Sequence, residues 1–342
     1  MVDKRVFITD CEGPISVNDN AFELAGKFIE DGEKFFSIIS RYDDILADEI
    51  KKPGYNAGDT LKLIVPFLKA YGLSNKKIIE FSKNNVLLIP HAKQTLKFVS
   101  KIMPSFIVST SYKQYIEALC DLTEFPFENT YSTHLDLDSF PLNSEEEKAL
   151  KNFRQRIMNN PGTENLDEIF WRKIPKMEIG EIIPSVKTVG GEGKKKAVED
   201  ILLKNQLNPS QVMYVGDSIT DVQPLQFARE NHGIAVSFNG NEFALREAEI
   251  AVISNNTVIT SVMADIFNRF GRNYLIEFIK AYSENPERAL ENFRLNLELL
   301  EKMEKVDKPL TSIITDENRD ELTKKSIKFR KKVRGEAIGG LG

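Results

Sequence analysis

The sequence predicts an α/β fold with a mostly parallel, Rossmann-like sheet covered by helices. Short runs of β-branched and aromatic residues recur, and stretches with helical periodicity separate them. We expect strands at 6–9, 105–109, 212–215, 233–238 and 250–253. Polar and acidic residues follow several of these runs directly. Because parallel strands present their carboxyl ends along one edge, we expect a ligand site there.

Two stretches exceed what a crossover connection needs. About ninety residues separate the first two predicted strands, and their helical patterns indicate an inserted helical cap at 17–85. A second excess, 135–189, has no role that the sequence identifies. We therefore assign 1–16 and 86–256 to the core.

The remaining segment, 257–342, shows apolar residues three and four apart and predicts an appended helical region. Its basic stretch KKSIKFRKKVRG is typical of a solvated helix end, followed by a flexible GGLG tail. The alternative is an arm that binds a protein partner or nucleic acid.

Composition restricts the function classes. The 342 residues include 41% hydrophobic and 28% charged side chains, with a net charge of −5, so a sizeable core is expected. Charges of both signs are dispersed, which favours small-molecule or protein partners over nucleic acid or a membrane. No apolar stretch is long enough for a signal peptide or membrane span, so we expect a cytoplasmic protein. Two cysteines far apart predict core thiols.

Acidic residues follow two of the predicted strands. Asp10 and Glu12 end the first run in VFITDCEGPI, and Asp217 and Asp221 follow the run at 212–215 in VMYVGDSITD. Four carboxylates at one edge would repel one another unless a cation neutralised them. Their hard oxygen atoms favour Mg²⁺. Alternate positions in an extended chain would place Asp10 and Glu12 on one side.

A hydroxyl and an ammonium complete the predicted site. Ser109 follows a strand in FIVSTS, with Thr110 and Ser111 as alternatives. Lys194 begins a helix in GGEGKKKAVEDILL, with its two neighbouring lysines as alternatives. A hydroxyl and an ammonium can hold phosphate oxygens while a carboxylate attacks phosphorus.

These motifs, in this order, resemble the haloacid dehalogenase superfamily of phosphohydrolases. The family has four motifs, and this chain matches them in order with DCEGP, a Ser-ended strand, a helix-starting lysine and GDSITD. The likeness spans about residues 4–255. The chain looks like an archaeal-type member, and VSTSYKQYIEAL followed by ENTYSTHL is similar to phosphoserine phosphatase relatives. The resemblance implies a helical cap that closes over small substrates.

The resemblance also implies roles for the site residues. Asp10 would be nucleophile and metal ligand, and Glu12 would be the general acid and base and a further metal ligand. Ser109, Thr110 and Lys194 would bind the phosphate; Asp217 and Asp221 would complete the metal site, Asp221 by supporting its loop. The chain departs from the family pattern where Glu12 replaces a second aspartate and where Pro14 follows Gly13.

The resulting expectation is a magnesium-dependent phosphatase that hydrolyses a small phosphorylated metabolite through an aspartyl-phosphate. The alternative is a weakly catalytic regulatory or assembly subunit that docks on a larger complex through its carboxyl-terminal helices. Its support is the substitution at Glu12 and the extra helices. A phosphotransferase with an acceptor other than water is a third interpretation.

Overall fold

A computed structural model describes residues 4–342 and confirms the predicted α/β class. Seven strands form one sheet in the order β3-β2-β1-β4-β5-β6-β7, and only the β6–β7 pair is antiparallel. The strands are β1 (Val6–Thr9), β2 (Ser105–Tyr112), β3 (Thr130–Thr133), β4 (Val212–Gly216), β5 (Ile234–Phe238), β6 (Ile250–Ile253) and β7 (Leu310–Ile313). The sequence analysis missed β3 and β7.

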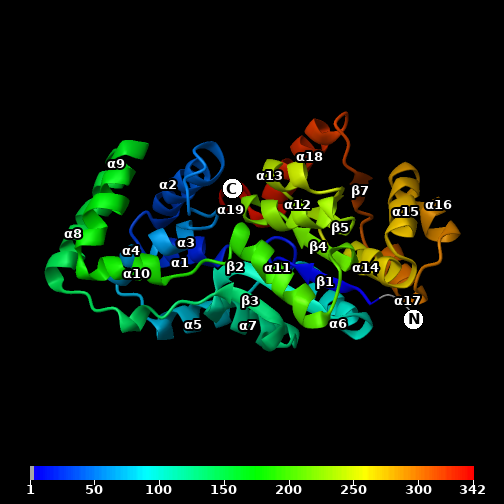
Figure 1. The fold of residues 1–342 in the computed structure, drawn as a ribbon, viewed down its shortest axis with the longest axis horizontal. Coiled ribbons are helices and arrows are strands. Elements are labelled where there is room, and N and C mark those ends of the chain that lie inside the picture. The colour runs from blue at the N-terminus through cyan, green and yellow to red at the C-terminus, as the bar shows by residue number, and fades with distance from the viewer. Residues whose placement is uncertain (1–3) are drawn as a thin grey trace.

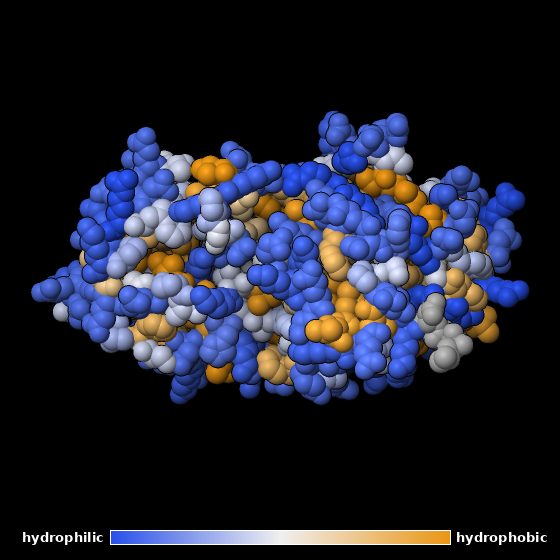
Figure 2. Space-filling model, in the orientation of Figure 1, coloured by the Kyte–Doolittle hydropathy of each residue, from blue (hydrophilic) through white to orange (hydrophobic). Residues whose placement is uncertain are grey.

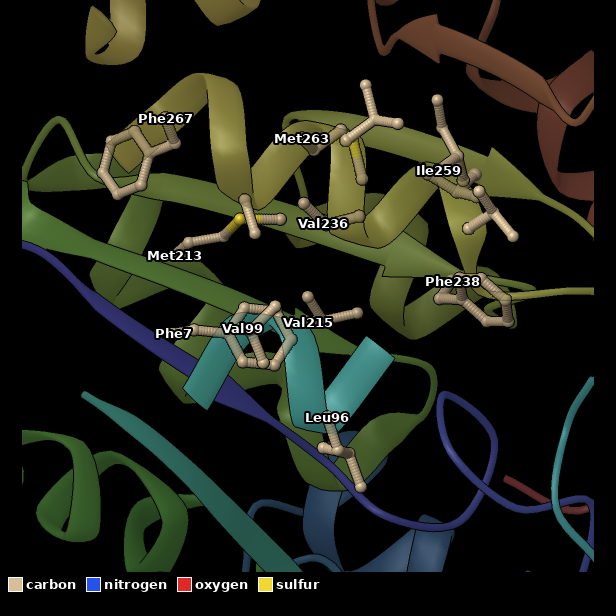
Figure 3. Close-up of a cluster of buried hydrophobic side chains, with 14 of the residues drawn as sticks. Phe7, Leu96, Val99, Met213, Val215, Val236, Phe238, Ile259, Met263 and Phe267 are labelled. Carbon is tan, nitrogen blue, oxygen red and sulfur yellow. The ribbon is translucent and has the colours of Figure 1, made fainter. Parts of the chain in front are cut away.

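Alternate residues of each central strand face opposite sides of the sheet, where separate apolar clusters lie. Phe7, Met213 and Val236 belong to the cluster shown in Figure 3, with side chains from α6 and α14. The opposite face carries Ile8 and Tyr214, packed by α11 and α12. The helices beside the sheet are α6 (Ala92–Ile102), α7 (Lys113–Thr123), α11 (Glu192–Asn205), α12 (Val222–Glu230), α13 (Glu242–Glu247) and α14 (Val258–Phe270).

The segment predicted as a cap is helical and joins the second insertion in one hydrophobic cluster. Its helices are α1 (Asn20–Phe28), α2 (Gly32–Asp44), α3 (Thr60–Leu63), α4 (Val65–Ala70) and α5 (Asn75–Asn85). The second insertion contributes α8 (Ser144–Asn159), α9 (Thr163–Glu168) and α10 (Ile182–Ser185). Figure 1 shows both groups together at one end of the molecule.

Buried aromatic contacts join the two groups. Phe67 of the first packs edge-to-face on Phe170 of the second, with ring centroids 6.0 Å apart, and Tyr42 stacks on the same ring. Because each such side chain contributes about 1.5–3 kcal/mol on burial, neither group can lose the other without exposing this core. The second insertion thus supplies part of the cap lobe's packing.

The carboxyl-terminal region is not wholly helical, because β7 extends the sheet. Its helices are α15 (Arg272–Glu284), α16 (Pro286–Asn292), α17 (Leu297–Glu304), α18 (Arg319–Arg334) and α19 (Glu336–Gly339). Helices α15 to α17 lie at the end opposite the cap lobe, whereas α18 and α19 return to the middle of the molecule (Figure 1).

Hydrophilic side chains cover most of the face in Figure 2, and the hydrophobic patches on it are separate. Within residues 4–342, no helix combines the length and apolar composition needed to cross a membrane. Both cysteines are free and buried, as predicted for core thiols.

Candidate active site

The site lies where β1 and β4 end side by side. The backbone N–H of Asp10 donates to the carbonyl of Val215 at 2.8 Å, so the two strands stay paired up to their acidic ends. Cys11 points into the apolar core, while Asp10 and Glu12 both line a cavity. The alternation expected from the sequence therefore places the two acids on one side.

Lys194 lies between two aspartates. Its Nζ is 2.7 Å from Oδ2 of Asp10 and 2.7 Å from Oδ1 of Asp221, and the side chain is fully buried. Burial alone would lower the pKa of Lys194, but the two carboxylates raise it above its ordinary value. The lysine is therefore held as a cation beside Asp10.

Asp221 shapes the loop after β4. Its Oδ2 accepts the backbone N–H groups of Asp217 at 2.9 Å and Ser218 at 3.1 Å, and its Oδ1 accepts the hydroxyl of Tyr214 at 2.7 Å. With Lys194 also on Oδ1, both oxygens are occupied. Asp221 accordingly fixes the position of Asp217.

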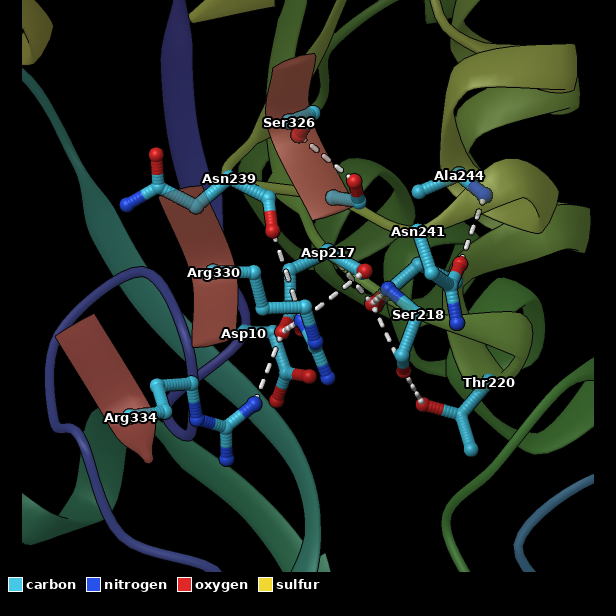
Figure 4. A network of polar contacts seen from close by, with 12 residues as sticks. Asp10, Asp217, Ser218, Thr220, Asn239, Asn241, Ala244, Ser326, Arg330 and Arg334 are labelled. Atoms are coloured by element: carbon cyan, nitrogen blue, oxygen red, sulfur yellow. Dashed lines mark hydrogen bonds and ion pairs between the residues drawn. The ribbon is translucent and has the colours of Figure 1, made fainter. Parts of the chain in front are cut away.

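Asp217 is held from one side only. The guanidinium groups of Arg330 and Arg334 both contact its Oδ2, the latter at 3.1 Å. Its Oδ1 is buried and has no hydrogen-bond partner among residues 4–342. Figure 4 shows both arginines reaching Asp217 from α18, with Asp10 beside it.

These carboxylates could hold a metal ion. One oxygen from each of Asp10, Asp217 and Asp221 lies within 4.8 Å of the other two. The donors are hard oxygen atoms, and the Oδ1 of Asp217 is buried without a hydrogen-bond partner among the described residues, so the group fits a small divalent cation. The carboxylate of Glu12, expected as a further ligand, is not in this group.

Glu12 is instead tied to the start of the cap. Its Oε1 accepts the backbone N–H of Asn20 at 2.7 Å. Burial raises the pKa of Glu12 well above its ordinary value, and the nearby charge of Asp19 raises it further. Burial also raises the pKa of Asp10, to about 7, against the opposing charge of Lys194. The raised pKa favours the protonated form of Glu12, which can then donate a proton within the cavity.

The hydroxyls of β2 line the same cavity. Ser109 donates its hydroxyl to the hydroxyl of Ser111 at 3.1 Å and accepts that residue's backbone N–H at 3.2 Å. The Ser109 hydroxyl is therefore already hydrogen-bonded within β2. The hydroxyl of Thr110 is buried with no partner among the described residues. Of the three alternatives, Thr110 presents the uncommitted hydroxyl.

The cap lobe forms part of the wall of the cavity, which measures about 80 Å³. This space suits a few water molecules or a small anion, because one water needs about 10–15 Å³. Residues from the core, the cap and the carboxyl-terminal region line it together: Asp10, Glu12, Asp19, Phe36, Asp43, Asp44, Gly58, Thr60, Leu61, Ser109, Thr110, Ser111, Asp217, Ser218, Arg330 and Arg334.

Two features of the site correct the sequence analysis. Arg330 and Arg334 were assigned to a solvated helix end, but they are only 2% and 9% exposed. The sequence analysis also did not foresee that cationic side chains pair with the aspartates: Lys194 contacts Asp10, and these two arginines contact Asp217. A usable signal was present, because Leu322, Ser326, Arg330 and Arg334 recur every four residues and so share one helix face.

Arg334 also connects the site to the cap. Its Nε donates to the carbonyl of Val17 at 3.0 Å, and its Nη2 donates to the carbonyl of Asn18. The chain entering the cap at Val17 pairs with the chain leaving it, because the backbone N–H of Val17 donates to the carbonyl of Leu87 at 3.0 Å. One side chain thus contacts both Asp217 and the first residues of the cap.

Comparison with solved structures identifies a full-length relative. The gene product AF1437 from Archaeoglobus fulgidus matches with a TM-score of 0.81 and 31% identity, over 99% of this chain and 99% of that chain. A substrate-bound phosphoserine phosphatase complex matches with a TM-score of 0.47 and 14% identity, over 74% of this chain and 95% of that chain. No family model matches the chain, and no curated protein matches it.

Proposed function

We propose that this chain is a magnesium-dependent phosphatase of a small phosphorylated metabolite. The chain belongs to the same family as the gene product AF1437 from Archaeoglobus fulgidus, and the proposal starts from that membership and from a haloacid dehalogenase-like fold. The observation that carries the proposal is the buried contact of Asp10 with Lys194, beside the free oxygen of Asp217.

In this proposal the cation would be held by Asp10 and Asp217, with Asp221 fixing their loop. When bound, it would supply charge stabilisation at the phosphoryl oxygens. Lys194, whose ammonium group contacts Oδ2 of Asp10, would stabilise the same developing charge. The unpartnered hydroxyl of Thr110 would donate to a phosphoryl oxygen, with Ser109 supporting the loop.

The chemistry has two steps. A carboxylate oxygen of Asp10 attacks phosphorus and the bond to the leaving oxygen breaks, while Glu12 gives that oxygen its proton. Glu12 then takes a proton from water, whose oxygen attacks the aspartyl-phosphate. This second step releases inorganic phosphate and restores Asp10, so Glu12 is reprotonated and the cycle is balanced.

The cap supports a small substrate. Residues of α2 and α3 form part of the cavity wall, and about 80 Å³ leaves little room beyond a phosphoryl group in this arrangement. A metabolite would therefore enter only when the cap moves, and closure would exclude bulk water from Asp10.

The test is a screen of phosphorylated metabolites with and without Mg²⁺, using wild type and Asp10→Asn. Wild type should release phosphate only with Mg²⁺ and retain label on the protein from a ³²P substrate, whereas Asp10→Asn should do neither. Asp265→Asn, a buried aspartate on α14 outside the cavity, is the matched control and should turn over normally. Turnover by Asp10→Asn at the wild-type rate would overturn the assignment. If wild type releases no phosphate from any compound, the regulatory interpretation replaces it.

A further inference from the structure

The most unusual part of the site is the face that α18 presents to it. Ser326, Arg330 and Arg334 are buried at four-residue intervals, and Ser326 donates its hydroxyl to the carbonyl of Gly240 at 2.6 Å. Arg330 also contacts the carbonyls of Asp217 and Asn239, at 3.3 and 3.5 Å. Figure 4 shows this face of the helix against the loops that follow β4 and β5. The helix is thereby fixed so that two guanidinium groups point at one carboxylate.

Both guanidinium groups contact the same oxygen of Asp217. Asp217 is 1% exposed, and the side chains of the two arginines are 2% and 4% exposed, so water screens these charges poorly. One negative charge thus faces two positive charges. The second oxygen of Asp217 stays free and buried, so it remains available as a metal ligand.

The remaining ion pairs balance the charge of the three aspartates that could hold the metal ion. Lys194 contacts both Asp10 and Asp221, so this group of three aspartates faces three cationic side chains. Glu12 and Asp19, which also line the cavity, accept backbone N–H groups at the start of α1 instead. A divalent cation that arrived alone would therefore bring two positive charges next to carboxylates that are already paired. A phosphoryl dianion brings two negative charges and restores the balance.

We propose that Arg330 and Arg334 couple the binding of the divalent cation to the binding of the phosphoryl group. They are positioning residues, because they act through Asp217: they hold one of its oxygens and weaken the attraction of the other for a cation alone. The proposal rests on the proposed function in assuming that cation and phosphoryl group meet beside Asp10 and Asp217. Because coupling is reciprocal, the cation must strengthen phosphate binding by the same factor.

Isothermal titration calorimetry tests this with Mg²⁺ and inorganic phosphate as the probes. For wild type we expect Mg²⁺ to bind at least about tenfold more tightly when phosphate is saturating, and phosphate to gain the same factor from Mg²⁺. Arg334→Gln and Arg330→Gln should bind Mg²⁺ alone at least about tenfold more tightly than wild type, and the effect of phosphate should fall below about threefold.

Two further variants separate charge from structure. Arg330→Lys keeps the positive charge and should retain most of the coupling. Lys324→Gln removes one charge from an exposed position of the same helix and should match wild type in both titrations. If Arg330→Gln does not fold, Arg334→Gln and Arg330→Lys still decide the question.

Several outcomes would overturn the proposal. Equal Mg²⁺ affinity in wild type with and without phosphate would do so, and so would an Arg334→Gln protein that behaves like Lys324→Gln. If either result is found and wild type still turns over a phosphate ester with Mg²⁺, only the coupling is wrong. If wild type binds no Mg²⁺ under either condition, the proposed metal-dependent function is wrong as well.

Discussion

Gly13 approaches Asp217 so closely that adding one methyl group should damage the loop of the candidate metal site. A Cβ atom at Gly13 would lie 2.8 Å from Oδ1 of Asp217 and closer still to its Oδ2 and Cγ. Asp217 cannot turn away freely, because both arginines of α18 hold its Oδ2. In addition, Gly13 has φ +109°, which costs a residue with a side chain about 1–3 kcal/mol.

Gly54→Ala is a matched control for this experiment. Gly54 has φ +75°, but a Cβ there would meet nothing within 4 Å, so the substitution should cost only the backbone term, about 1–2 kcal/mol. Gly13→Ala adds displacement of a buried ion pair, for which about 3–5 kcal/mol is typical when the pair is broken outright. We therefore expect Gly13→Ala to lower the free energy of unfolding by at least about 2 kcal/mol more than Gly54→Ala does.

Urea unfolding followed by circular dichroism measures the free-energy difference, and calorimetry with Mg²⁺ and phosphate measures the ligand site. Gly13→Ala should also weaken Mg²⁺ binding at least about tenfold, the equivalent of about 1.4 kcal/mol, while Gly54→Ala should leave it unchanged. If the two alanine variants unfold at the same urea concentration and bind Mg²⁺ equally, the close approach of Gly13 to Asp217 has no energetic consequence and the reasoning is refuted.

Three other substitutions test separate parts of the site. Glu12→Gln removes the titrating proton and should lower turnover by about two to four orders of magnitude in a steady-state assay; unchanged turnover would make Glu12 structural. Lys194→Met leaves Asp10 and Asp221 buried without their shared cation, so urea unfolding should show a loss of about 3–5 kcal/mol, and a loss below about 1 kcal/mol would contradict the ion pair. Burial raises the pKa of Asp43 to about 7, so the folded state binds its proton more tightly and stability falls as pH rises from about 4 to 7. Asp43→Asn should flatten that slope, by roughly 4 kcal/mol at most, and an unchanged slope would show that Asp43 ionises normally in the fold.

The position of the acidic residues at the strand ends could be predicted because the signal is local. Apolar runs at β1 and β4 stop at Asp10 and Asp217, and parallel strands bring such ends to one edge whatever the details of the loops. The alternation that separates Cys11 from its acidic neighbours follows from strand geometry alone. The order of the motifs is the basis of the chemistry that we propose.

The tertiary structure decided what completes the site. The 135–189 segment packs into the cap lobe through contacts such as Phe67 with Phe170, which no local pattern specifies. β7 joins the sheet as an antiparallel edge strand whose partner, β6, is more than fifty residues earlier in the chain.

The same holds for the arginines of α18. A polar helix rich in lysine and arginine has the same local pattern whether its charges meet water or a buried carboxylate. The sequence by itself determined which residues carry acids and where the strands end. Only the tertiary structure placed Arg330 and Arg334 on Asp217, because that contact joins residues more than one hundred positions apart and depends on how α18 packs against the loops after β4 and β5.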